Sequence, residues 1–142
     1  MNPTPAVTGF HEGPINDVII YPLKKYFDDR GWLAELFRHD DIDAEFHPVM
    51  SYISFTKPGI QRGPHEHVDQ ADLFCFIGPS TFNIRLWDNR KESSTFNNLI
   101  SLLVGEDNPM AVVVPKGVVT LMTPDETPTG AITPMLLLFV TT

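Results

Sequence analysis

Proline is the residue type that most constrains how this chain can fold. The sequence holds 13 prolines in 142 residues, about 9% where ~5% is usual. They are spread along the chain, and nearly every one stands beside a short apolar run. Because proline ends helices and is confined to the ends and edges of strands, little room is left for a long helix. The prolines therefore predict a chain of short strands.

The alternation of apolar and polar residues also indicates strands. In the segments 49–56 and 81–87, apolar side chains fall on nearly every second position, as in half-buried strands. Only the stretch 40–46 has weak helical character. About eight or nine such strands would form an all-β domain, namely a sandwich, a jelly roll or a small barrel. Four further apolar runs are predicted as strands: 73–77, 110–114, 118–122 and 135–141.

Length and charge narrow the class of protein. The 142 residues suit a single domain, 1–142, in which we expect 1–16 to be an N-terminal arm. The net charge of −8 gives no broad attraction for nucleic acid or an anionic membrane, so neither is an expected partner. No apolar run approaches the ~20 residues of a membrane span. A single cysteine, Cys75, fits a reducing cytoplasm, where we expect the protein to reside.

Polar chemistry is concentrated in the segment 59–78, GIQRGPHEHVDQADLFCFIG. If His65 and His67 lie on one strand, their side chains point to the same face. Two imidazoles aimed into a barrel form either half of a metal site or a base with a polar partner. Arg62, just before them, can hold an anion or a developing oxyanion. The alternative is an exposed strand end without a function.

A metal site needs separate consideration. The spacing of His65, His67 and Asp72 is similar to the first metal motif of the cupin superfamily, with aspartate in the place of glutamate. The second motif of such a site ends in histidine, but Thr120 occupies that position here, and threonine is a poor ligand for zinc, iron or manganese. We therefore expect no metal or other cofactor. A site made of the two histidines and Asp72 is the alternative.

A resemblance to a known family is carried by four segments: 27–37 (FDDRGWLAELF), 54–67 (SFTKPGIQRGPHEH), 87–96 (WDNRKESSTF) and 114–122 (VPKGVVTLM). In this order, they resemble the cupin-fold nucleotide-sugar epimerases and isomerases, best known through dTDP-4-dehydrorhamnose 3,5-epimerase. The resemblance implies a cupin-type double-stranded β-helix, or jelly roll, that forms a homodimer. It also implies isomerisation or epimerisation of a nucleotide-activated 4-keto sugar.

The resemblance implies a role for two residues of the polar segment. His65 is similar to the family's general base, which removes the proton next to the ketone. Arg62 is similar to the arginine that contacts the substrate near the forming enolate. The chemistry agrees, because this proton needs a base that titrates near neutrality and the enolate oxygen needs fixed donors.

The resemblance also implies residues that bind the nucleotide. Arg30 and Glu35 match positions that bind it by reaching across from a partner subunit. Trp32, between them, is the best candidate for stacking on the nucleobase. Arg90 lies in the matched segment 87–96, where contact with the diphosphate and a role in the fold are both open.

The chain also departs from the epimerases. His67 stands where they have glutamine, and Asp72 lies near the place of a lysine that helps to hold the oxyanion. The family's proton-donating tyrosine has no counterpart in the stretch 134–142. We also expect the chain to lack the C-terminal extension that supplies an aspartate to orient the base.

Some of these departures match a sister family, the dTDP-sugar 3,4-ketoisomerases. These share the pattern RGxHxH and carry a tyrosine thirteen residues before the first histidine, where this chain has Tyr52. Either His67 or Tyr52 is therefore the candidate second proton carrier. Two more interpretations stay open. One is a metal-dependent cupin enzyme, and the second is a sugar-nucleotide-binding protein that has lost catalysis.

Overall fold

The computed structural model describes residues 9–124 and 133–141, and these residues form strands with short connections. One 3-10 turn, η1 (Ala44–Phe46), interrupts them. The strands are β1 (His11–Glu12), β2 (Ile19–Pro22), β3 (Tyr26–Asp28), β4 (Gly31–Leu33), β5 (Met50–Thr56), β6 (Arg62–His65), β7 (Gln70–Phe76), β8 (Thr81–Asp88), β9 (Asn98–Gly105), β10 (Met110–Val114), β11 (Val118–Pro124) and β12 (Thr133–Thr141).

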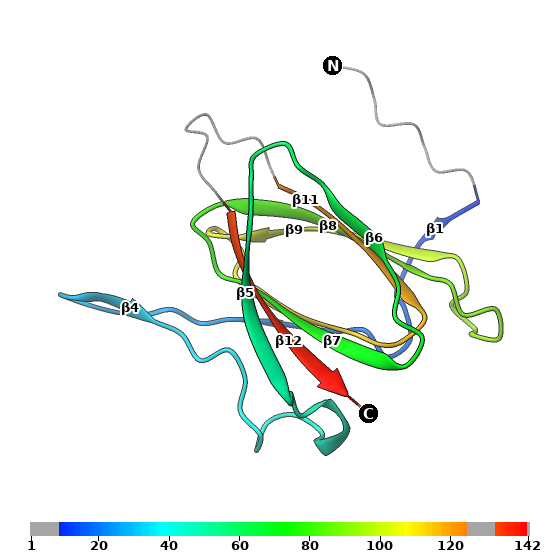
Figure 1. Cartoon of the computed structure of the whole chain (residues 1–142), viewed down its shortest axis with the longest axis horizontal. Coiled ribbons are helices and arrows are strands. Elements are labelled where there is room, and N and C mark those ends of the chain that lie inside the picture. Colours follow the sequence, from blue (N-terminus) through cyan, green and yellow to red (C-terminus); the bar gives the residue numbers. More distant parts are fainter. Residues whose placement is uncertain (1–8, 125–132, 142) are drawn as a thin grey trace.

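Two five-stranded sheets face each other and make up most of the molecule. The first sheet has the order β1-β9-β8-β11-β6, and the second has the order β2-β10-β7-β12-β5. Figure 1 looks along the space between them, with the first sheet above and the second below. All pairs within the sheets are antiparallel except β1 with β9. The predicted all-β jelly roll is confirmed.

The core fills the space between the sheets. On β8, Phe82, Ile84 and Leu86 are buried while the residues between them are partly exposed, as the alternation predicts. On β7 the inward residues include Phe74 and Phe76, and Phe76 packs against Phe82 with ring centroids 5.5 Å apart. This apolar core holds the sheets together. The polar residues of β5, β6 and β7 lie outside it, toward one end of the barrel.

A segment between β4 and β5 covers the outer face of the second sheet. Leu36, Phe37 and Phe46 pack on the outward residues of β7 and β10, which include Leu73 and Cys75. In the stretch of weak helical character, only η1 forms. Burial under this cover raises the pKa of the Cys75 thiol to about 12, so the cysteine is an unreactive part of the core.

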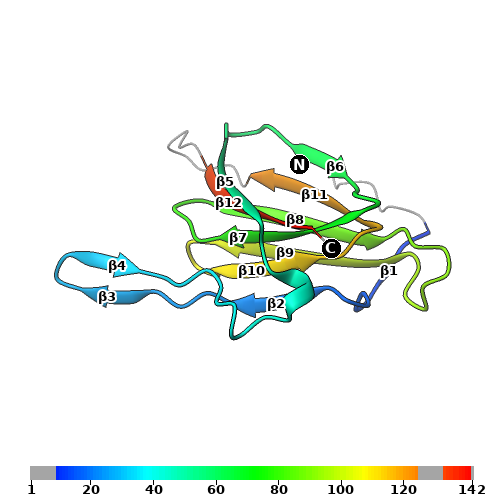
Figure 2. The ribbon, with the colours of Figure 1, turned by 60° about the horizontal axis from the view of Figure 1, so that its bottom comes forward.

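The hairpin of β3 and β4 projects from the barrel (Figure 2). Its side chains lie largely in solvent, and Phe27 is 74% exposed. The hairpin turns at Gly31, whose φ is +136°. Since apolar residues are exposed on both strands, the isolated chain leaves this element without a packing partner.

Several expected boundaries differ in the structure. The described residues hold twelve strands rather than eight or nine, because β1, β3, β4 and β6 are too short to show a period. Within the expected N-terminal arm, residues 1–8 lie outside the described residues. The part that is described reaches β9 through β1, where His11 and Glu12 pair with Asn98 and Leu99. In the described part of the chain, no helix is long and apolar enough to cross a membrane.

Candidate active site

A bulge in β6 brings Arg62 and His65 to the same face. On β11, Thr120 pairs with His65 and Met122 pairs with Arg62, so three steps along β6 match two steps along β11. In a regular strand, residues three apart point to opposite faces, and one extra residue cancels this difference. Paired residues share a face, and Thr120 and Met122 are both buried. Arg62 and His65 therefore point to the inner side of the barrel, where Arg62 is partly buried and His65 stays exposed.

Gly63 makes this bulge possible. Its φ is +101°, and a Cβ atom there would lie 2.6 Å from the carbonyl oxygen of Thr120. A larger residue would push β6 away from β11. The glycine of the RG-x-H pattern is thus required by the close approach of two backbones, and it sets the position of His65.

Arg62 is held in place by β5. Its Nε donates a hydrogen bond to Oγ1 of Thr56 over 2.5 Å, and one Nη donates to the carbonyl oxygen of Phe55 over 2.8 Å. Thr56 is buried, and Tyr52 lies on the same face of β5 four residues earlier. Burial and the nearby charge of Asp72 raise the pKa of Tyr52, against the opposing effect of Arg62. The structure thus brings Tyr52, Arg62 and His65 to the same end of the barrel.

His67 reaches the site from outside the strand. Strand β6 ends at His65, so the two histidines do not share a strand, but Nε2 of His67 lies 3.1 Å from Oδ2 of Asp72. Asp72 is 5% exposed, and Gln70 donates to its Oδ1 over 3.1 Å. Burial raises the pKa of Asp72 above its ordinary value, although His67, Gln70 and His65 each lower it in part.

The residues expected to bind the nucleotide lie elsewhere in the chain. Arg30, at the tip of the β3–β4 hairpin, pairs with Asp28, and its side chain is 88% exposed. On β4, Trp32 is also exposed, and Nζ of Lys25 lies 4.7 Å from its ring centroid. Glu35, just after β4, contacts Arg38. Within one chain, the hairpin of β3 and β4 lies apart from β6, the strand that ends at His65 (Figure 2).

Arg90 is engaged in the fold. Its Nε donates to Oδ1 of the fully buried Asp88 over 2.8 Å, and its two Nη atoms reach Asp17 and the carbonyl oxygen of Asn16. Ser93 and Thr95 also donate to Asp88. Of the two roles left open by the sequence, these contacts support the role in the fold.

The turn between β10 and β11, on which Arg90 packs, supports the backbone of His67. The Gly117 N–H donates to the carbonyl oxygen of His67 over 2.8 Å, and the side chain of Arg90 packs on Gly117 so closely that a Cβ there would lie 2.5 Å from Arg90 Cγ. Next to it, Asn89 donates from Nδ2 to both carboxylate oxygens of Glu66. The segment 87–96 thus acts on the site indirectly, through residues 66 and 67.

Four residues of this arrangement were missed at the level of sequence. Thr56 could have been found, because it shares the alternation of Tyr52. Gln70 stands two residues before Asp72 and therefore on its face of β7. The link from Gly117 to His67, and that from Asn89 to Glu66, join distant segments and leave no local pattern.

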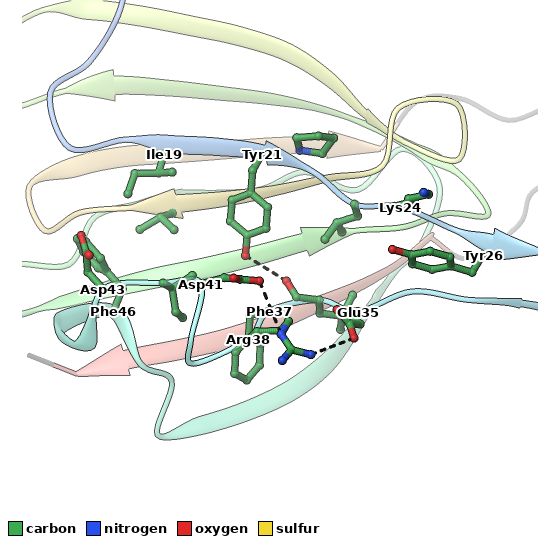
Figure 3. Close-up of a pocket in the computed structure, with 15 residues that line it drawn as sticks. Ile19, Tyr21, Lys24, Tyr26, Glu35, Phe37, Arg38, Asp41, Asp43 and Phe46 are labelled. Atoms are coloured by element: carbon green, nitrogen blue, oxygen red, sulfur yellow. Dashed lines mark hydrogen bonds and ion pairs between the residues drawn. The ribbon is translucent and has the colours of Figure 1, made fainter.

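A cavity of about 490 Å³ lies outside the barrel, under the segment between β4 and β5. Figure 3 shows Tyr21 of β2 on one side and Glu35 and Arg38 on the other. Tyr21 donates from its hydroxyl to the carbonyl oxygen of Leu36 over 3.1 Å. This cavity is separate from the group around His65, although Glu35 and Tyr26 on its rim belong to the base of the hairpin.

The metal alternative gains no geometric support. In residues 9–124, whose side chains the structure describes, no three His, Cys, Asp or Glu side chains are arranged to hold a metal ion. Asp72 and His67 are in contact, whereas His65 affects Asp72 through its charge. What the arrangement offers is a base, a paired imidazole, a fixed guanidinium and a phenol, which together suit proton transfer next to a polarised carbonyl.

Comparison with solved structures confirms the fold. A dTDP-6-deoxy-D-glucose-3,5-epimerase from Legionella pneumophila, solved with dTDP-4-keto-L-rhamnose, superimposes with a TM-score of 0.77 at 20% identity, over 92% of this chain and 70% of that one. A dTDP-4-dehydrorhamnose 3,5-epimerase from Bacillus anthracis, solved with TDP and pyrophosphate, gives 0.73 at 21% identity, over 89% and 73%.

Sequence comparison extends this likeness to the family. The probable low-salt glycan biosynthesis epimerase Agl13 of Haloferax volcanii is 39% identical over 103 residues, 71% of this chain but less than two thirds (65%) of the relative. The spore coat polysaccharide biosynthesis protein SpsL of Bacillus subtilis is 38% identical over 104 residues, 73% of this chain and 68% of the relative. A family model described as dTDP-4-dehydrorhamnose 3,5-epimerase matches residues 12–123. The chain therefore belongs to the dTDP-4-dehydrorhamnose 3,5-epimerase family.

Proposed function

We propose that this protein isomerises or epimerises a nucleotide-activated 4-keto sugar in carbohydrate biosynthesis. One observation carries the proposal: the bulge in β6 aims a base, His65, and a fixed cation, Arg62, into the same barrel. The family membership and the names of the curated relatives, an epimerase and a polysaccharide biosynthesis protein, support the same class of substrate.

In the proposed reaction, neutral His65 removes the proton from the carbon next to the ketone. The electrons of the C–H bond form a C=C bond, and the carbonyl oxygen becomes an oxyanion beside Arg62. Because Thr56 and the Phe55 carbonyl already fix this guanidinium, it needs little reorganisation as the charge develops. A second carrier then returns a proton to carbon, and the C=O bond re-forms.

The choice of second carrier separates two products. Return of a proton to the same carbon from the opposite side inverts it, which is epimerisation. When the proton removed from C3 is replaced by one added to C4, the C3 hydroxyl gives up its proton to form the new ketone and the C4 oxygen takes one up, as in the 3,4-ketoisomerases. Ketoisomerisation stays a candidate because it needs a second proton carrier beside the base, and the chain offers two. Tyr52 lies on β5, and His67 contacts Asp72 of β7.

We further propose a cytoplasmic homodimer, in which each hairpin covers the partner's barrel. The exposed apolar residues Phe27 and Leu33 need a surface to cover them. Arg30, Trp32 and Glu35 would then meet the nucleotide of a sugar bound at the partner's His65. The single, buried Cys75 is compatible with the cytoplasmic location.

The test is solvent exchange on a dTDP-4-keto-6-deoxy sugar in D₂O, followed by proton NMR. We expect the wild type to exchange the protons next to the ketone and His65→Ala to slow exchange about 10²- to 10⁴-fold. His11→Ala, a change of an exposed histidine on β1, is the matched control. If the wild type exchanges no faster than His65→Ala, proton abstraction by His65 is wrong.

Different results would identify a different function. Nucleotide binding without any exchange would indicate a binding protein that has lost catalysis. Exchange that is lost on dialysis against EDTA and restored by a divalent metal would favour the metal-dependent enzyme built on His65, His67 and Asp72. The position of the ketone in the product distinguishes epimerisation from ketoisomerisation.

A further inference from the structure

A carboxylate is buried inside the barrel, close to both histidines. Asp72 lies on the inward face of β7 that continues with Phe74 and Phe76, and it is 5% exposed. Taking a carboxylate out of water costs several kcal/mol unless its partners compensate. Among residues 9–124, the side chains that bond to it are His67 and Gln70, and neither is a permanent cation. For the fold alone, an amide or an apolar residue would fill this place at less cost.

The contact determines the state of His67. A carboxylate only accepts hydrogen bonds, so the Nε2 atom of His67 carries the proton when it lies 3.1 Å from Asp72 Oδ2. The proton that His67 exchanges with a substrate is then the one on Nδ1. When His67 takes up a proton, both ring nitrogens carry one, and Nε2 still donates to Asp72.

Asp72 acts directly on only one of the two histidines. It contacts His67, whereas its interaction with His65 is through charge at a distance. Gln70 holds the other oxygen of Asp72 from two residues before it on β7. Gly117 fixes the backbone of His67 through the carbonyl oxygen. The ring and the backbone of His67 are therefore both held in place. A segment without a function would not require both contacts.

We propose that Asp72 is a positioning residue that holds His67 as the second proton carrier of the site. The proposal rests on the proposed function and deepens it: it selects His67 over Tyr52 and gives Asp72 a role other than metal binding. During turnover, the Nδ1 proton of the imidazolium moves to carbon, while the proton on Nε2 stays on His67 and remains hydrogen-bonded to Asp72. No net proton is consumed, because His65 has removed one from the sugar.

A double-mutant cycle tests this role. The variants Asp72→Asn, His67→Gln and the double variant are compared with Asp69→Asn, which makes the same charge change at an exposed neighbour. We expect Asp72→Asn to lower kcat by about 10- to 100-fold with KM within about threefold. In the His67→Gln background, Asp72→Asn should have an effect of less than about twofold, because it acts through His67.

The opposite results would overturn the proposal. If the kcat losses of the two single variants multiply, Asp72 acts independently of His67. If Asp72→Asn matches Asp69→Asn, it has no role in turnover. A full loss on Tyr52→Phe, with His67→Gln near wild type, would assign the second carrier to Tyr52.

A second measurement does not depend on turnover. In the free protein, at a pH at which the His67 ring is neutral, nitrogen-15 NMR should find its proton on Nε2 in the wild type and a mixture of tautomers in Asp72→Asn. A wild-type His67 protonated on Nδ1 alone would contradict the positioning role even if catalysis is confirmed. If instead no exchange is seen but Nε2 carries the proton, the proposed function fails and so does the carrier role of His67, while the pairing stands.

Discussion

At the scale of single residues, Asp88 shows how a buried charge can stabilise this fold. Burial by itself would raise the pKa of the Asp88 carboxyl, but hydrogen bonds from Arg90, Thr95 and Ser93 outweigh it and hold the pKa well below its usual range. Asp72 differs, because its partners do not overcome burial and its pKa stays raised. The two aspartates therefore differ: the partners of Asp88 overcome the cost of its burial, whereas those of Asp72 offset this cost only in part.

We expect Asp88→Asn to lower the free energy of unfolding by about 3 kcal/mol at pH 7, because it leaves Arg90 without its buried partner. The pKa of Asp88 is lowered in the folded state, so its stabilisation is present above the unfolded value, near ~4, and is lost as the pH falls through the folded value. The advantage of the wild type over the variant should therefore shrink as the pH falls below about 4. Urea unfolding at pH 7 and pH 3 measures both differences.

The control for this prediction is Asp29→Asn, which removes an exposed carboxylate from the β3–β4 turn. It should change the free energy of unfolding by less than about 0.5 kcal/mol. Equal urea midpoints for the two variants at pH 7 would contradict the structural role of Asp88. A difference that stays constant down to pH 3 would contradict its lowered pKa.

At the scale of elements, the strands were predictable where their pattern was local. Strand β10 has the predicted bounds because it is a continuous apolar run, and β8 extends the prediction by a single residue because its alternation continues along the strand. The bulge in β6 was not predictable, because it depends on how β6 pairs with β11. The contact of His67 with Asp72 was hidden for a similar reason, since His67 lies beyond the strand end. The resemblance to a family thus pointed to His65 as the candidate base, and only the structure showed what surrounds it.

The turn between β10 and β11 carries the next prediction. Gly117 has a φ of +79°, and a Cβ there would lie 2.5 Å from Arg90 Cγ. We expect Gly117→Ala to lower the free energy of unfolding by about 2–3 kcal/mol, since backbone strain and the displacement of Arg90 add. It should also lower kcat, because the Gly117 N–H holds the His67 carbonyl. Thermal or urea unfolding and the exchange assay measure the two effects.

Gly59→Ala is a matched control for this change. Gly59 has a similar φ of +73°, but a Cβ there would meet no atom within 4 Å. It should therefore show the backbone strain alone, at about 1 kcal/mol. In an Arg90→Ala background, the extra cost of Gly117→Ala should disappear. Equal losses for the two glycine variants would show that the contact with Arg90 does not matter.

At the scale of the whole molecule, the two groups of candidate site residues do not meet within one chain. His65 and Arg62 lie at the barrel, while Arg30 and Trp32 lie on the projecting hairpin (Figure 2). The sequence could locate both groups, through the resemblance, but could not show that the hairpin carries its residues away from the chain's own barrel. In a two-fold symmetric dimer, each hairpin would complete the partner's site.

Subunit complementation tests this arrangement. His65→Ala and Arg30→Ala should each be nearly inactive alone. In a mixed dimer, one site combines His65 of the Arg30→Ala chain with Arg30 of the His65→Ala chain and is intact. Half of the dimers in an equal mixture are mixed and each has one intact site, so unfolding and refolding the chains together should restore about a quarter of wild-type activity.

The same mixture with Phe27→Glu on both chains should stay inactive, because the exposed hairpin could no longer pack on its partner. If the two variants together are no more active than the sum of their separate activities, while sedimentation shows mixed dimers, Arg30 serves its own chain and the cross-subunit site is wrong.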